Sequence, residues 1–273
     1  MIINNLTSEF ENFLINKINE KNIQSNNLKK AMLYSVERGG KRLRPGLILL
    51  TAQAFNFDVK ELYNYAAALE MVHEFSLVHD DLPSMDNDDL RRNKPTTHIV
   101  YGEADALLAG DALLNLAFEI SLNDMNNNFS KNKLKAYEFM FKKSGSEGMI
   151  DGQSFEMIAN NDVNDYIKTI ENKTCALFQI AIYGSGLYLG LDDRYLNILD
   201  KLSYYIGIGF QVVDDKSDND GIYNISKKHG DDIILECKNN IDSIYDKLLD
   251  CNININGYKE LTDTLFSRDF INI

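Results

Sequence analysis

Apolar residues recur at helical spacing along most of the 273-residue chain. Within each run they repeat every three or four residues, as they do on the buried face of an α-helix. Strand-like alternation is nowhere convincing, and no shift in composition marks a linker. The pattern therefore predicts one all-α domain over residues 1–273. The clearest runs lie at 47–57, 62–79, 107–122, 135–158 and 163–184.

Short signals outside these runs predict where helices begin and where loops lie. Ser8 followed by Glu11 has the spacing of a capping box, which predicts that a helix begins at Ser8. The stretch 123–133 is rich in asparagine and is predicted as a loop. The segment 227–232 opens with two lysines and a histidine, and we expect a basic loop there.

The segment 39–45 combines two glycines, a basic run and a proline. The glycine pair is expected to end one helix, and Pro45 suits the first turn of the next. Lys41 and Arg44 then lie in the lead-in to a helix N-terminus, where unpaired N–H groups favour anions. Most basic turns are merely solvated, but basic clusters are scarce in so acidic a chain. We therefore expect an anion site here.

Net charge excludes some classes of partner. The formal charge is −13 and the isoelectric point is about 4.8. Nucleic acid and an anionic membrane surface are therefore not expected as partners.

The three cysteines are few, odd in number and not spaced as a metal site, which favours reduced thiols in the cytoplasm. The segment 174–191 is uncharged, but it contains Gln179 and several glycines. It is therefore predicted to be a buried helix with a break near 184–186, and not a membrane span. The N-terminus lacks the basic segment of a signal peptide.

The stretch 77–94 is crowded with acidic residues and then turns abruptly basic. Mg²⁺ takes carboxylate and phosphate oxygens as ligands, so this pattern suits a metal-bound diphosphate. Pro83 disfavours helical geometry at Leu82, and the helix cannot simply continue. We therefore expect a bulged helix end that brings Asp80 and Asp86 together.

A second acidic cluster follows another long apolar helix. Asp214 and Asp218 are four residues apart and share a helix face, and Gln211 lies one turn earlier on nearly the same side. Such a pair alone is more often a solvated helix end, but two clusters of this kind favour metal binding. Gly207 and Gly209 weaken the helix, and close helix packing is the expected reason for them.

His73 precedes Asp80 by seven residues, nearly two helical turns, so the two differ by only about 20° around the axis. His73 is therefore a candidate to bind one anionic group while Asp80 organises another. A histidine on a helix surface is the alternative, and taken alone it would be favoured.

Five segments together resemble the short-chain trans-isoprenyl diphosphate synthases, and the bacterial type of farnesyl diphosphate synthase in particular. The resemblance spans nearly the whole chain in order, and the longest match is highly specific. The segments are GGKRLRP at 39–45, LVHDDLPSMDNDDLRRNKPTTH at 77–98, GMIDGQ at 148–153, KT at 173–174 and FQVVDDKSD at 210–218.

This resemblance implies an isoprenoid-synthase-type helical bundle around a central cavity, a homodimer and a Mg²⁺-dependent prenyltransferase. It implies that isopentenyl diphosphate condenses with dimethylallyl or geranyl diphosphate to give farnesyl diphosphate. Three Mg²⁺ ions would be bound with the allylic diphosphate. A closing C-terminal loop would help to exclude water.

Roles are carried over residue by residue. The metal ligands implied are Asp80, Asp86, Asp214 and Asp218, with Asp215 nearby or acting through water. The residues implied at the allylic diphosphate and its surroundings are Arg91, Lys173, Thr174, Gln211 and Lys227. The residues implied at the isopentenyl diphosphate are Lys41, Arg44, His73 and Arg92.

Phe75 lies five residues before Asp80, or about 7.5 Å along the helix. In the family an aromatic residue there is associated with short products because it floors the cavity. We therefore expect farnesyl diphosphate as the main product. The alternative is that Phe75 is ordinary core, because core aromatics are common.

The chain also departs from the family pattern. Cys175 stands where glycine usually follows Lys-Thr, Lys216 replaces an apolar residue, and a lysine-serine-threonine-tyrosine run is missing near 236–239. These departures put loop closure, and hence rate, in doubt. A geranylgeranyl diphosphate synthase, a terpene cyclase and a non-catalytic partner subunit of a prenyl synthase remain the alternatives.

Overall fold

The computed structural model describes residues 2–160, 162–217 and 224–267. Contacts divide the chain into two compact units. We call Ile3–Leu49 with Lys60–Phe129 the N-terminal unit, and Leu50–Val59 with Ser130–Ile273 the C-terminal unit. The single domain expected over residues 1–273 stays a prediction.

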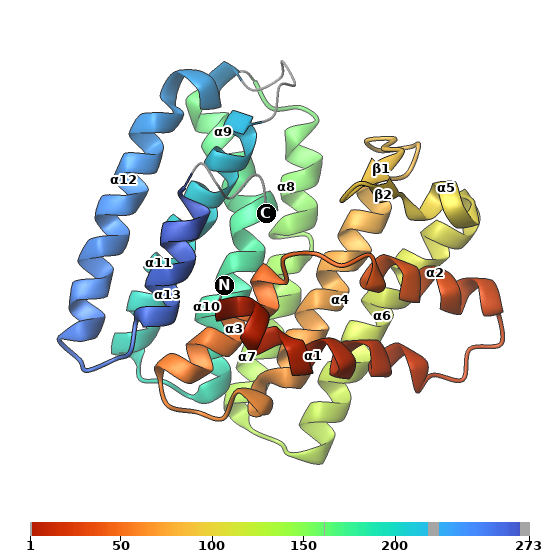
Figure 1. The fold of residues 1–273 in the computed structure, drawn as a ribbon, viewed down its shortest axis with the longest axis horizontal. Helices are drawn as coiled ribbons and strands as arrows, with labels where there is room; N and C mark the ends of the chain where they lie inside the picture. The colour runs from red at the N-terminus through yellow and green to blue at the C-terminus, as the bar shows by residue number, and fades with distance from the viewer. Residues whose placement is uncertain (1, 161, 218–223, 268–273) are drawn as a thin grey trace. The chain divides into compact units, whose positions relative to one another are not determined.

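Helices dominate the described chain, as predicted (Figure 1). The first elements are α1 (Ile2–Asn19), α2 (Asn26–Glu37), α3 (Leu43–Ala54), η1 (Val59–Leu62), α4 (Tyr63–Asp80), β1 (Leu90–Arg91), β2 (Lys94–Pro95), α5 (Thr97–Tyr101) and α6 (Glu103–Asn127). The remaining elements are α7 (Lys131–Ser144), α8 (Met149–Glu156), α9 (Val163–Ile170), the π-helical turn η2 (Glu171–Cys175), α10 (Ala176–Leu189), α11 (Asp193–Ser217), α12 (Asn224–Leu249) and α13 (Asn256–Leu265).

Helix α4 lies at the core of the N-terminal unit. Every residue from Ala66 to Val72 is buried, so the helix is covered on all sides. It packs along α6 and also touches α2 (Figure 1). The residues at the C-terminal end of α4 are therefore positioned by a tightly packed helix.

Helix α11 is packed in the same way in the C-terminal unit, against α10, α12 and η2 (Figure 1). A Cβ atom on Gly207 would lie 2.7 Å from Cys175 Sγ, and one on Gly209 would collide with the ring of Phe266. The close packing expected at these two glycines is therefore confirmed.

Several boundaries differ from the predictions. Helix α1 begins at Ile2, so Ser8 lies inside it and its hydroxyl donates to Asn5 O instead of capping the helix. The loop predicted at 123–133 is confined to 128–130, because α6 continues to Asn127 and α7 begins at Lys131. The basic segment from residue 227 belongs to α12. These predictions were wrong because packing overrides local composition.

Two further differences concern the backbone. The glycines at 184 and 186 do not break α10, which runs on to Leu189. A small antiparallel ribbon pairs Leu90 with Pro95 and Arg91 with Lys94, although no strand was predicted. Its connecting residues Arg92 and Asn93 have φ angles of 55° and 59°, the geometry of a tight two-residue hairpin.

All three cysteines are free thiols. Among the described residues, no helix has the length and apolarity that crossing a membrane requires.

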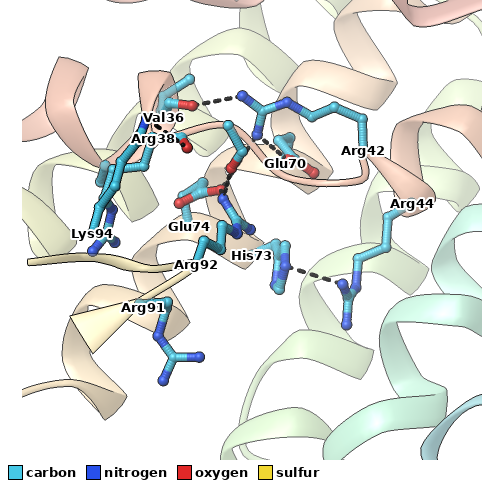
Figure 2. A network of polar contacts seen from close by, with 12 residues as sticks. Val36, Arg38, Arg42, Arg44, Glu70, His73, Glu74, Arg91, Arg92 and Lys94 are labelled. Atoms are coloured by element: carbon cyan, nitrogen blue, oxygen red, sulfur yellow. Dashed lines mark hydrogen bonds and ion pairs between the residues drawn. The ribbon is translucent and has the colours of Figure 1, made fainter. Parts of the chain in front are cut away.

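Buried charges stabilise the connection between α2 and α3. Arg42 is 5% exposed and donates to Glu70 at 2.6 Å, to Glu74 at 3.3 Å and to Val36 O at 2.6 Å (Figure 2). Glu11 of α1 adds a fourth partner at 2.6 Å. Burial alone lowers the pKa of Arg42, but Glu70, Glu11 and Glu74 together raise it above its ordinary value.

Replacing Arg42 with methionine should lower the free energy of unfolding by about 3–5 kcal/mol, because the buried Glu70 loses its arginine and the buried Glu74 keeps only Arg92. Urea denaturation with an unchanged m-value would measure the loss. Lys60→Met is the control, since Lys60 pairs with Glu9 at the surface and should contribute within about 1 kcal/mol. Equal losses in both variants would contradict the importance of the buried network.

Candidate functional site

The loop after α4 brings the first two aspartates together, as predicted. Asp86 N donates to Asp80 O at 2.9 Å, and Met85 N donates to Leu82 O at 2.8 Å, so the chain folds back after Pro83. Asp86 is exposed and Asp80 is half-buried. Two carboxylates on one folded turn provide oxygen atoms of the kind that a hard cation prefers.

Asp81, between them in sequence, has a different environment. Its side chain is fully buried and pairs with Arg91 and, at 3.6 Å, with Arg38. Burial raises the pKa of Asp81, whereas Arg91 and Arg38 lower it. Its carboxylate therefore holds two arginines within the protein.

The β1–β2 ribbon sends its neighbouring arginines to different partners. Arg91 binds Asp81 and, at 3.2 Å, Asp88. Arg92 binds Glu74 at 3.1 Å and also donates to Gly39 O (Figure 2). The ribbon therefore separates the two cations that the sequence placed side by side.

Gly39 and Gly40 give Arg92 the room to lie there. Their φ angles are +83° and +154°, values that other residues rarely adopt. A Cβ atom on Gly40 would lie 2.7 Å from the Arg92 guanidinium carbon. The glycine pair therefore ends α2 and also permits the close approach of Arg92.

His73 supports Arg44. Arg44 Nη1 donates to His73 Nε2 at 3.0 Å (Figure 2). Burial lowers the pKa of His73 well below its usual range, and Arg44 and Arg92 lower it further. A neutral imidazole that accepts at Nε2 carries its proton on Nδ1. Arg44 itself lies in the first turn of α3, slightly later than the lead-in expected from the sequence.

The N-terminal unit thus gathers several cations around the end of α4 (Figure 2). Lys41 is exposed, and Lys94 donates to Arg38 O at 3.3 Å. Arg38 is buried, with its guanidinium 5.5 Å from the Tyr34 ring centroid. Burial lowers the pKa of Arg38, opposed by Glu74 and Asp81.

Phe75 is buried within α4, and its ring meets the His79 ring edge-on at 5.3 Å. His79 Nε2 lies 3.0 Å from Leu107 O of α6. Gly110 of α6 leaves the space that this imidazole occupies. The Phe75 ring therefore packs against a histidine side chain that is itself held against α6.

In the C-terminal unit, hydrogen bonds join η2 to the end of α11. Thr174 donates to Gln211 Oε1 at 2.8 Å, and Gln211 Nε2 donates to Asp215 Oδ1 at 2.7 Å. Tyr166 donates to Asp215 Oδ2 at 2.6 Å. Asp215 is therefore held by the protein, as Asp81 is.

The other residues expected at this site have varied surroundings. Asp214 and Lys227 are exposed. Lys173 pairs with Glu156 of α8 at 2.5 Å, a partner that the sequence did not predict. Asp218 lies outside the described residues. Lys216, which departs from the family pattern, pairs with Asp231 of α12.

Three contributors were missed from the sequence. Arg38 directly precedes Gly39 and Gly40, so the sequence already placed it beside the basic residues that follow this pair. Glu156 follows the GMIDGQ segment closely enough to have been considered. Tyr166 gives no local signal, because an aromatic residue at helical spacing is usually core.

The aspartate carboxylates described above are of a chemical type that suits Mg²⁺. Exposed or half-buried carboxylates are available at Asp80 and Asp86 in the N-terminal unit and, separately, at Asp214 in the C-terminal unit, and they are hard oxygen donors. Within the part of the chain that the structure describes, no group of three or more His, Cys, Asp or Glu side chains is already gathered around a common point. Mg²⁺ commonly keeps waters and takes only one or two carboxylates beside substrate phosphates, so the residues fit this mode of binding.

Comparisons with known proteins agree with these observations. Residues 25–240 match the family model "Polyprenyl synthetase". The farnesyl diphosphate synthase of Geobacillus stearothermophilus is 42% identical over 200 residues, which cover 71% of this chain and 67% of that protein.

Two solved structures extend the similarity to the whole chain. A geranyltransferase from Legionella pneumophila has a TM-score of 0.89 at 28% identity and covers 100% of this chain and 97% of its own. An isoprenoid synthase family member from Thermotoga neapolitana has a TM-score of 0.75 at 30% identity and covers 98% of this chain and 99% of its own. The all-α fold is therefore of the isoprenoid-synthase type, and the chain belongs to the polyprenyl synthetase family.

Proposed function

We propose that the protein is a Mg²⁺-dependent trans-prenyltransferase that makes farnesyl diphosphate from isopentenyl diphosphate and dimethylallyl or geranyl diphosphate. The observation that carries the proposal is the turn holding Asp80 and Asp86 beside the arginines of the same unit. A ligand that is polyanionic and metal-bound matches both parts of this arrangement.

In the N-terminal unit, Asp80 and Asp86 are assigned to Mg²⁺ and Arg91 to the allylic diphosphate. Lys41, Arg44, His73 and Arg92 are assigned to isopentenyl diphosphate. Because His73 Nε2 accepts from Arg44, we give the imidazole the role of orienting that guanidinium.

In the C-terminal unit, Asp214 is assigned to Mg²⁺, and the same role for Asp218 stays a prediction from the sequence. Lys173, Thr174, Gln211 and Lys227 are assigned to the allylic diphosphate and its surroundings. Lys173 already has an anionic partner in Glu156, so binding a diphosphate would exchange or share this partner.

The reaction begins when the allylic C–O bond breaks and the electron pair leaves with diphosphate. Mg²⁺, when bound, offsets the charge that develops on this leaving group. The double bond of isopentenyl diphosphate then attacks the allylic cation, and its position depends on the residues that bind its own diphosphate. Loss of a proton, to the departing diphosphate in this proposal, completes the product.

Purified protein should convert radiolabelled isopentenyl diphosphate and geranyl diphosphate into farnesyl diphosphate only when Mg²⁺ is present. Asp86→Asn should lower kcat/KM by at least about a hundredfold, because a metal ligand at the developing charge is lost. Asp89→Asn is the matched control, since Asp89 is also exposed in this loop but has no assigned role, and its activity should stay near that of the wild type.

Chromatography of the products from each allylic primer separates the alternatives. A main product of twenty carbons would identify a geranylgeranyl diphosphate synthase, and a cyclised product a terpene cyclase. No metal-dependent product from any primer would refute the enzyme proposal and favour a non-catalytic subunit.

Phe75→Ala should shift the main product to longer chains, because the buried ring would no longer limit the growing chain. Leu69→Ala is the control, since Leu69 is also buried in α4 but lies about 120° away around the helix axis. Product lengths would be compared by mass spectrometry at equal conversion. An unchanged profile in Phe75→Ala would show that Phe75 is ordinary core.

We also propose a homodimer in the cytoplasm. The free cysteines support a reducing compartment, and α6 supports an interface. Leu107, Phe118 and Leu122 are 47%, 41% and 62% exposed, and they lie within about 60° of one another around the helix axis. An exposed apolar stripe of this kind is typical of an interaction surface.

Replacing Phe118 and Leu122 together with glutamate should convert the dimer to a monomer, because four charges would meet across the interface. Light scattering coupled to size-exclusion chromatography would measure the mass. Leu249→Glu changes a leucine of similar exposure on α12 and should leave the dimer intact. A monomeric wild type, or a dimeric double variant, would contradict this proposal.

A further inference from the structure

The carboxylate of Asp215 is held from two sides within the C-terminal unit. Tyr166 OH donates to Oδ2 at 2.6 Å, and Gln211 Nε2 donates to Oδ1 at 2.7 Å. Each oxygen therefore has a donor, and hydrogen bonds to a charged acceptor are stronger than neutral ones. These contacts fix the orientation of the carboxylate at the end of α11.

The amide of Gln211 is fixed in turn by what lies at its two ends. Oε1 accepts from Thr174 Oγ1 at 2.8 Å, while Nε2 donates one hydrogen to Asp215. Turning the amide over would place its oxygen against the Asp215 carboxylate, which cannot donate when ionised. The contact with Asp215 therefore determines the orientation of the Gln211 amide, with its nitrogen toward the carboxylate. The second N–H of that nitrogen then has a defined direction.

Tyr166 suits the role of holding Asp215. Its side chain is 4% exposed and packs with Ile170, Cys175 and Val212 in one buried cluster. The ring therefore has little freedom, and a buried phenol hydroxyl requires a partner. The bond to Asp215 provides that partner and ties α9 to α11.

We propose that Tyr166 is a positioning residue for prenyl transfer. Its hydroxyl orients Asp215, Asp215 orients the Gln211 amide, and the second N–H of Gln211 binds the allylic diphosphate. This inference rests on the proposed function, since it needs the assignment of Gln211 to the allylic diphosphate. The competing explanation is that the Tyr166–Asp215 bond only joins two helices.

Tyr166→Phe removes one oxygen atom and keeps the packed ring. It should lower kcat/KM for geranyl diphosphate by at least about tenfold, the lower end of the range for a hydrogen bond to a charged group. The affinity for the unreactive S-thiolodiphosphate analogue of geranyl diphosphate should fall by a similar factor. KM for isopentenyl diphosphate should not change, because its assigned residues lie elsewhere. Steady-state kinetics and isothermal titration calorimetry with Mg²⁺ give the two readouts.

Tyr204→Phe is a matched control in the same core. Tyr204 OH donates to Glu171 Oε1 at 2.9 Å, and its ring packs against the same cluster. The two variants each remove a phenol hydroxyl from a carboxylate, so their thermal midpoints should fall similarly. Tyr204→Phe should keep the analogue affinity of the wild type.

A double-mutant cycle with Gln211→Ala tests the route of the effect. If Tyr166 acts through Gln211, the double variant should bind the analogue no more weakly than Gln211→Ala alone. Additive losses would overturn the proposed route. Equal affinities in Tyr166→Phe and Tyr204→Phe would overturn the role of Tyr166 while leaving the enzyme proposal intact.

Failure of the proposed function would give a different result from failure of the role proposed for Tyr166. A wild type that makes no product from any primer refutes that function, and calorimetry still reports on Tyr166. A wild type that also fails to bind the analogue overturns both proposals.

Discussion

Two arginines on one buried carboxylate tie the N-terminal unit together. Arg42 and Arg92 both donate to Oε1 of Glu74, which is completely buried in α4. Arg42 comes from the α2–α3 connection and Arg92 from the β1–β2 ribbon. Burial raises the pKa of Glu74 to about 7, opposed by Arg92. The ionised form of Glu74 therefore depends on both arginines. The α2–α3 connection, helix α4 and the β1–β2 ribbon accordingly stabilise one another.

That dependence explains why neighbouring basic residues have unlike roles. Lys41 is exposed, whereas Arg42 turns inward with a φ of 43°. Arg91 and Arg92 diverge differently on the ribbon, since each turns to a buried carboxylate, Asp81 and Glu74 respectively. The sequence predicted a basic cluster, but only packing decides which cation is buried in the fold and which stays exposed.

The sequence predicted best where a local rule was strong. Pro83 forces the turn that joins Asp80 and Asp86, and Gly207 and Gly209 mark close packing. It failed where a local signal competed with burial, as at Ser8, which lies inside α1. Glu156 lies close to a recognised segment, but its pairing with Lys173, 17 residues away, required the fold. Tyr166 carries no pattern of its own, so only the fold could pair it with Asp215.

The two aspartate pairs share one physical arrangement. Consecutive residues on a helix point about 100° apart, so two adjacent carboxylates have different surroundings. Asp81 turns toward Arg38 and Arg91, and Asp215 turns toward Tyr166 and Gln211. Asp80 remains half-buried and Asp214 exposed. The inward member of each pair can therefore orient the groups around a ligand, because its carboxylate is paired within the protein. The outward member keeps more of the exposure that a metal ligand needs. A substitution at the inward position should act through its protein donors, and one at the outward position through the metal.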